Sequence, residues 1–134
     1  MPLMEALNIR QSAREFSSQA LSLQDISDLC WAAWGFNRDD KRTAPSSQDK
    51  QEMELYVFLE KGVYLYNAQE HILEMVQKGD LRQHAGLQDF VALAPLNFAY
   101  VSNLTKAGVE TPEGITAESL IPSHANSGFM AQNV

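Results

Sequence analysis

The sequence predicts a single domain that combines helices with strands. The chain has 134 residues, which is enough for one domain with one hydrophobic core. One segment carries apolar residues at helical spacing behind a capping signal, and several short runs rich in β-branched and aromatic residues follow it. The composition is 45% hydrophobic and 20% charged, as in a globular chain, and no apolar run is long enough to span a bilayer.

The first clear element is a helix over residues 22–34. Ser22 with Asp25 three residues later has the form of a capping box, and Gly35 marks the expected end. We interpret both Trp31 and Trp34 as core residues rather than as residues that stack on a cofactor. The apolar residues at helical spacing are Ile26, Leu29, Cys30, Ala33 and Trp34.

Four further segments predict strands. Glu54–Glu60 and Gly62–Tyr66 are short runs of β-forming residues with a tight connection. Asn67–Glu70 predicts a turn, and His71–Val76 would close a hairpin with the preceding strand. Asn97–Val101 predicts a further, buried strand.

The remaining segments predict loops and two more helices. Asn37–Glu52 is a polar stretch too long for a tight turn, and such loops are often functional. Asp80 predicts the cap of a helix that carries Leu81 and Ala85. Gly108–Gly114 predicts a loop. Ser123–Val134, after Pro122, predicts a last helix without a glycine or a basic last turn at its end.

Charge and cysteine content exclude several classes of protein. The net charge of −7 and the pI near 4.8 argue against nucleic acid and anionic membranes as partners. The start of the chain lacks the basic-then-apolar pattern of a secretion signal, so we expect a cytoplasmic protein. Cys30 is the sole cysteine, which we expect to be buried and inert. The histidines lie far apart, so we expect no metal site: His71, His84 and His124.

A local cationic segment stands out against the acidic balance. Arg10 and Arg14 flank Ser12 at alternating positions, and an arginine guanidinium offers a planar fork of donors that suits phosphate. The segment therefore indicates a site for an anion. Taken alone, the same residues are also compatible with a solvated, charged stretch of chain.

Two other segments carry polar groups that could contact a ligand. Thr43–Gln51 contains Pro45, two serine hydroxyls and amide side chains. Gln88 could supply both a donor and an acceptor to the edge of a heterocycle. In isolation the first is equally an ordinary polar loop, and the second is a surface glutamine.

Taken in order, these segments resemble the flavin-dependent nitroreductase family, and most closely the branch that includes the SagB-type dehydrogenases. Arg10–Phe16 is similar to the family's N-terminal phosphate-binding motif, and Pro45–Gln51 to its Pro-Ser-x-x-Asn-x-Gln loop. The other segments that carry the resemblance are Trp31–Arg38, Arg42–Ser46, Leu55–Val57, Gly62–Tyr66, Gly79–Arg82, Gln88–Val91 with Ala94–Pro95, and Ser127–Val134.

The resemblance implies an FMN-binding, nitroreductase-like α+β fold over residues 1–134, with an antiparallel sheet packed with helices. It also implies an intertwined homodimer with flavin at the subunit interface. The implied cofactor-binding residues form three groups. Arg10, Gln11, Ser12 and Arg14 would hold the phosphate and the pyrimidine side; Gln88 would face the pyrimidine edge; Pro45, Ser46, Ser47 and Asp49 would approach from the partner subunit.

The activity implied is that of an FMN-dependent oxidoreductase. It would transfer electrons from NAD(P)H to a small organic acceptor such as a nitroaromatic or a quinone, and no side chain need act as a nucleophile. Two residues depart from the family pattern. Gln11 replaces the usual second arginine, and Asp49 stands where asparagine is usual. An ionised aspartate only accepts hydrogen bonds, so it loses a donor and adds charge.

Family members continue past the position of Asn133. We therefore expect a chain truncated at the C-terminus, in which residues 1–134 are the N-terminal part of the family domain and the fold is incomplete at that end. Two alternatives to the enzyme follow. One is a catalytically inactive flavin-binding or interaction domain, and the other is a structural domain without a cofactor.

Overall fold

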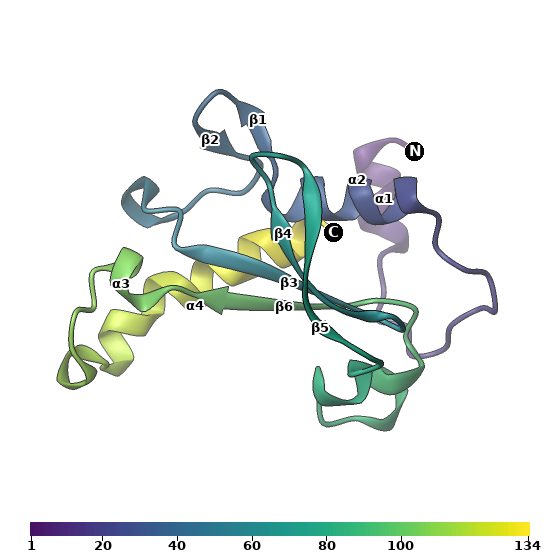
Figure 1. The fold of residues 1–134 in the computed structure, drawn as a ribbon. Coiled ribbons are helices and arrows are strands. Elements are labelled where there is room, and N and C mark those ends of the chain that lie inside the picture. The colour runs from purple at the N-terminus through teal and green to yellow at the C-terminus, as the bar shows by residue number, and fades with distance from the viewer.

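The computed structural model describes all residues 1–134 and shows helices combined with antiparallel strands (Figure 1). The α-helices are α1 (Leu3–Ile9), α2 (Leu23–Trp34), α3 (Leu104–Ala107) and α4 (Ala117–Gln132). The strands are β1 (Phe36–Arg38), β2 (Lys41–Arg42), β3 (Met53–Leu59), β4 (Gly62–Asn67), β5 (Ile72–Lys78) and β6 (Asn97–Ser102). Short 3₁₀ turns occur at η1 (Ser47–Asp49), η2 (Arg82–His84), η3 (Asp89–Leu93) and η4 (Pro112–Gly114).

The main sheet has four strands in the order β5-β4-β3-β6, and every pair is antiparallel. Val57 in the central strand β3 pairs with Tyr64 on one side and with Phe98 on the other. The consecutive strands β3, β4 and β5 form the hairpins that the sequence predicts. β6 is half-buried rather than buried as predicted, because it is an edge strand with Val101 exposed.

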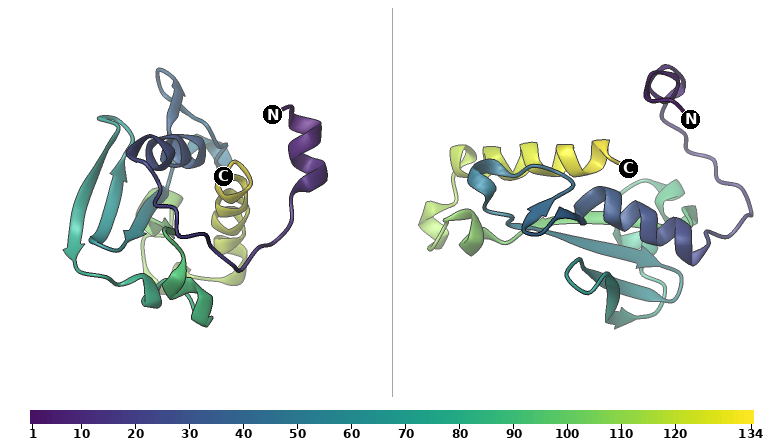
Figure 2. Two further views of the ribbon diagram at one scale, coloured as in Figure 1. Left: turned by 90° about the vertical axis from the view of Figure 1, so that its right-hand side faces the viewer. Right: turned by 90° about the horizontal axis from the view of Figure 1, so that it is seen from above.

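The hydrophobic core lies between the sheet and two helices. Met53, Leu55 and Val57 alternate along β3 and are all buried, as expected for residues that share one face of a strand. α2 and α4 contact each other and β3, and Figure 2 shows both beside the sheet. The core residues are Cys30, Ala33, Trp34, Ala44, Met53, Leu55, Val57, Tyr66 and Met130.

Local capping explains the bounds of α2. The Ser22 hydroxyl accepts a hydrogen bond from Asp25 N at 3.1 Å, and the Asp25 carboxylate accepts one from Ser22 N at 2.8 Å. Gly35 ends the helix. These predictions are confirmed, but the prediction for Trp31 is wrong. Trp34 is 2% exposed and belongs to the core cluster, whereas Trp31 is 45% exposed and lines a surface pocket.

The helix predicted after Asp80 is not formed, and the chain makes short 3₁₀ turns there instead. The Asp80 carboxylate accepts two hydrogen bonds from the Arg82 guanidinium, at 2.9 and 2.7 Å, and Arg82 also donates to Ala94 O at 3.0 Å. This bond ties the segment to a residue twelve positions away. Leu87, just beyond η2, is fully exposed, so it adds no buried apolar contact that would stabilise a helix there.

α4 begins six residues earlier than the sequence predicts. The Thr116 hydroxyl accepts from Ser119 N at 3.1 Å, and the Ser119 hydroxyl accepts from Thr116 N at 2.9 Å, which makes a capping box. Pro122 therefore lies inside the helix rather than before it. A proline there removes one backbone hydrogen bond. Burial of Asn126 and Met130 in the later turns helps to hold the helix in place.

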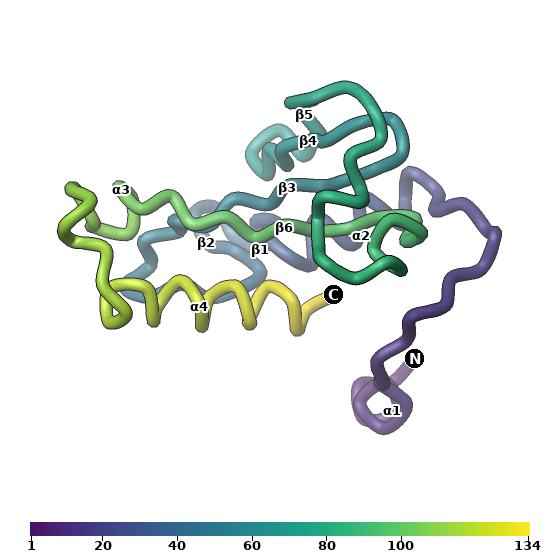
Figure 3. The backbone as a smooth tube through the Cα atoms, turned by 90° about the horizontal axis from the view of Figure 1, so that it is seen from below, coloured from purple at the N-terminus to yellow at the C-terminus, as the bar shows by residue number.

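The N-terminal segment differs most from the rest of the fold. No sequence signal predicted α1, whose residues are all at least partly exposed. Figures 2 and 3 show α1 standing apart from the sheet, joined to α2 by a long extended linker over residues 10–22. Within the long polar loop, β1 and β2 form a small hairpin that was also not predicted.

Candidate functional site

The loop between β2 and β3 is strained at three closely spaced positions. Gln48, Asp49 and Gln51 have φ angles of 54°, 55° and 48°, in the left-handed region that residues with a side chain rarely adopt. Each such residue costs about 1 kcal/mol relative to an ordinary conformation, so the loop must be held by other contacts. Strain of this kind is concentrated at functional sites.

Side chains from the β1–β2 hairpin and the loop itself hold this conformation. The Lys41 ammonium lies 2.5 Å from Asp49 Oδ2, and Gln51 Nε2 donates to Asp49 Oδ1 at 3.2 Å. The same Gln51 amide donates to Asp40 O at 2.7 Å, and Gln51 N donates to the Ser46 hydroxyl at 3.0 Å. The loop therefore has one well-defined shape, although it contains little regular secondary structure.

Arg42 joins this loop to the core. Its guanidinium carbon lies 3.9 Å from the centre of the Phe36 ring and 4.9 Å from that of Trp34. It donates to Trp34 O and to Gln51 Oε1, each at 3.0 Å. Partial burial lowers the pKa of Arg42 from its ordinary value, and an arginine remains charged nonetheless. Arg42 belongs to the segment Arg42–Ser46 that carries the family resemblance, but no sequence signal indicates these contacts.

The predicted phosphate-binding residues lie on the linker that follows α1. Arg10, Gln11, Ser12 and Arg14 are all exposed. The three ion pairs of the chain involve neither Arg10 nor Arg14, so both guanidinium groups keep their charge uncompensated by a carboxylate.

Gln88 lies close to this linker through its own loop. The Arg14 guanidinium is 5.8 Å from the centre of the Phe90 ring, two residues after Gln88. Gln88 is exposed and precedes the turn η3. The structure thus brings Arg14 next to the segment that carries Gln88. The exposed guanidinium of Arg14 and the amide of Gln88, two residues from Phe90, are donors of the kinds that suit a phosphate and the edge of a heterocycle.

The third predicted group lies elsewhere. Figures 1 and 3 show the β2–β3 loop, with Pro45, Ser46, Ser47 and Asp49, at the end of the molecule opposite the N-terminal linker. One chain therefore does not bring the loop together with Arg14 and Gln88.

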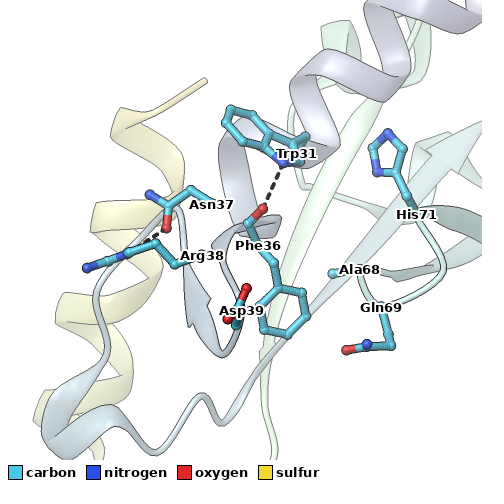
Figure 4. Close-up of a pocket in the computed structure, with 8 residues that line it drawn as sticks. All are labelled: Trp31, Phe36, Asn37, Arg38, Asp39, Ala68, Gln69 and His71. Atoms are coloured by element: carbon cyan, nitrogen blue, oxygen red, sulfur yellow. Dashed lines mark hydrogen bonds between the residues drawn. The ribbon is translucent and has the colours of Figure 1, made fainter.

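A separate pocket of about 610 Å³ opens between α2, the β1–β2 hairpin and the β4–β5 turn (Figure 4). Trp31 and Phe36 line it, and Trp31 Nε1 donates to Phe36 O at 3.2 Å. His71 lies at its edge. The other lining residues are Asn37, Arg38, Asp39, Ala68 and Gln69.

His71 is a connecting residue that the sequence did not reveal. Its Nε2 is 2.7 Å from the Ser27 hydroxyl, and its Nδ1 is 2.7 Å from the Tyr66 hydroxyl. Desolvation raises the pKa of Tyr66 to about 12, so this hydroxyl stays protonated. The partners of His71 are 44 and 5 residues away in the chain, so no sequence spacing indicates this arrangement. It fastens the β4–β5 turn to α2.

No three His, Cys, Asp or Glu side chains come together in a way that could hold a metal ion. No helix combines the length and the apolar character that a membrane crossing requires.

Comparison with known proteins gives the family. The sequence pattern of the nitroreductase family matches residues 7–134, and the chain belongs to this family. A curated relative from Methanocaldococcus jannaschii, named "putative nitroreductase", is 28% identical over 144 aligned positions, which cover 98% of this chain and 70% of the relative.

Two solved structures share the fold. A crystal structure described as a "putative nitroreductase" from Ralstonia eutropha JMP134 is 40% identical, with a TM-score of 0.86 over 99% of this chain. The chain spans 62% of the length of that protein. The second is the Escherichia coli microcin synthetase McbBCD complex with truncated pro-MccB17 bound, which has a TM-score of 0.68 at 16% identity. The match covers 96% of this chain and 55% of the matched chain, and it shows the fold alone. The predicted nitroreductase-like α+β fold is confirmed.

Proposed function

We propose that this protein is an FMN-dependent oxidoreductase that passes electrons from NAD(P)H to a small organic acceptor such as a nitroaromatic or a quinone. Membership of the nitroreductase family supports a flavin-dependent oxidoreductase. The observation that carries the proposal is the contact of Arg14 with Phe90, which sets a free guanidinium beside the segment of Gln88. This pairing of a cation with an amide suits a cofactor that has both a phosphate and a heterocycle.

The residues of this chain would bind and orient the cofactor rather than react. Arg10, Ser12 and Arg14 would donate to the phosphate and the pyrimidine side, where charge-assisted hydrogen bonds are the stronger kind. Gln88 would offer its amide to the pyrimidine edge. FMN, when bound, supplies the electron-transfer chemistry. Gln11 would contribute an uncharged amide in the same segment.

We propose further that two copies of the chain form one functional unit. The separation of the β2–β3 loop from Arg14 supports this, because Pro45, Ser46, Ser47 and Asp49 would then reach the flavin bound by the other subunit. α1 offers an apolar surface for such a dimer, since its exposed side chains include Leu3, Met4, Leu7 and Ile9. α4 adds Ile121 and Phe129, which are 61% and 46% exposed.

The test is the visible absorption spectrum of the purified protein after FMN is added and unbound FMN is removed. We expect a retained flavin spectrum that is bleached by NADH or NADPH and restored by a quinone. A protein that retains no flavin contradicts the proposal. Retained flavin without bleaching instead supports the inactive flavin-binding domain.

A further inference from the structure

We propose that Lys41 offsets the negative charge of Asp49, so that the strained loop presents less negative charge to the flavin of the partner subunit. The inference rests on the proposed function, because the loop has a flavin to face only if FMN binds. Under this proposal Lys41 positions Asp49 and compensates its charge. Lys41 lies outside the segments that the family resemblance links to the cofactor.

Both carboxylate oxygens of Asp49 have donors from this chain. Lys41 Nζ lies 2.5 Å from Oδ2, and Gln51 Nε2 donates to Oδ1 at 3.2 Å. The hydrogen bond from Lys41 is the main reason that the pKa of Asp49 lies below its ordinary value. Asp49 is therefore ionised, and its two oxygens accept hydrogen bonds from Lys41 and Gln51.

Lys41 is itself directed by a second carboxylate. Its ammonium lies 3.3 Å from Asp40 Oδ2, so Lys41 bridges two acidic residues that are nine positions apart. Asp40 forms the turn of the β1–β2 hairpin, which Arg42 anchors between Phe36 and Trp34. The Lys41 ammonium therefore lies on a hairpin that packs on the core, which fixes its position.

The backbone conformation explains why asparagine or aspartate occurs at position 49, and the charge of aspartate explains why a cation is needed beside it. Asp49 has φ of 55°, and asparagine and aspartate tolerate this region better than other residues with side chains. Asparagine would meet this requirement without charge. Aspartate meets it with a negative charge, which would repel an anionic cofactor whose ring gains negative charge on reduction unless a cation compensates it.

The experiment compares four proteins: the wild type, Lys41→Gln, Asp49→Asn and the double variant. FMN affinity is measured by quenching of flavin fluorescence, and the midpoint potential of bound FMN by equilibrium with redox dyes. For Lys41→Gln we expect the affinity for FMN to fall about fivefold, which is the upper range for the loss of an exposed ion pair. We also expect a more negative midpoint potential for bound FMN. We expect the double variant to match the wild type, because it removes one positive and one negative charge together. We expect Asp49→Asn to bind FMN at least as tightly as the wild type, because Lys41 then pairs with Asp40 alone.

The outcomes separate the inference from the proposed function. If the wild type binds FMN and Lys41→Gln matches it in affinity and potential, the inference is overturned and the proposed function stands. If the double variant stays as weak as Lys41→Gln, Lys41 acts only by supporting the loop, and the charge argument is overturned. If the wild type binds no FMN, both fall. Circular dichroism of all four proteins verifies that each is folded.

Discussion

The Asn126 amide in α4 donates a 2.7 Å hydrogen bond to the carboxylate of Glu52, which lies 74 residues earlier and immediately precedes β3. Both residues are 2% exposed, and the second oxygen of Glu52 has no hydrogen-bond partner. A buried polar pair of this kind fixes the position of one element on another, because any shift leaves a desolvated group without a partner.

Loss of Asn126 should therefore destabilise the fold more than its size suggests. We expect Asn126→Ala to lower the free energy of unfolding by about 2 kcal/mol, since the Glu52 carboxylate is left buried without its donor. Urea unfolding followed by circular dichroism measures it. Gln132→Ala, at an exposed position of the same helix, is the control and should change stability by less than about 0.5 kcal/mol. Equal effects of both would contradict the role of the pair.

Arg14 should contribute directly to cofactor affinity. We expect Arg14→Gln to weaken FMN binding about tenfold, because a charge-assisted hydrogen bond is worth more than a neutral one. Fluorescence quenching by titration gives the dissociation constant. Lys78→Gln removes an exposed cation on β5 instead and should leave affinity unchanged. If both variants lose affinity equally, the effect is one of net charge, and Arg14 is not a specific contact.

The exposed apolar side of α1 should be needed for dimerisation. Leu7 is 50% exposed, and we expect Leu7→Glu to shift the protein toward monomer because a charge would be buried against the partner. Analytical ultracentrifugation measures the change. Leu23→Glu is the matched control, since Leu23 is 79% exposed at the first turn of α2. A wild type that is monomeric at all concentrations rules out the dimer and the proposed contribution of the β2–β3 loop.

Asp80 should make the protein slightly less stable as the pH is lowered. Its hydrogen bonds from Arg82 lower its pKa from 3.8 to about 2. Because the Asp80 pKa is lower in the folded state, ionised Asp80 stabilises the fold at any pH above its pKa in the unfolded chain. This contribution is lost as the pH falls from about 4 toward 2. We expect Arg82→Gln to reduce that loss and to return the Asp80 pKa toward 3.8, as measured by NMR titration of the carboxyl carbon. An unchanged Asp80 pKa would contradict the role of Arg82.

Cys30 should be inert in the folded protein. It is 1% exposed, and desolvation raises the pKa of its thiol to about 12. Thiolate is the reactive form, so we expect no reaction with a disulfide reagent at mildly alkaline pH. In concentrated urea the same chain should react with one equivalent. Rapid modification without urea would show that the interface between α2 and the sheet opens.

Several elements follow from signals that lie within a few residues. The capping box of Ser22 and Asp25 and the terminal Gly35 define α2 because both ends are set by local hydrogen bonds. The runs that form β3, β4 and β5 are consecutive, so their pairing needs only short turns. The resemblance of ordered motifs also led to the nitroreductase family, which the comparisons confirm. Pro122 misled the prediction of α4, because the Thr116 cap outweighs the helix-breaking tendency of a proline in the second turn.

Signals within the sequence predict the combination of helices with strands, the central hairpins, the ends of α2 and the family. Tertiary packing accounts for the exposure of Trp31 beside a buried Trp34, and for the contacts by which Arg42 and Lys41 hold the strained loop. It also brings the Arg14 guanidinium within 5.8 Å of the centre of the Phe90 ring, and it leaves the N-terminal linker and the β2–β3 loop at opposite ends of the molecule (Figure 1). The range of the interactions explains the difference. Caps, turns and periodicity act between neighbours in the chain, whereas these relationships depend on how α2, the hairpin and the linker pack around the sheet.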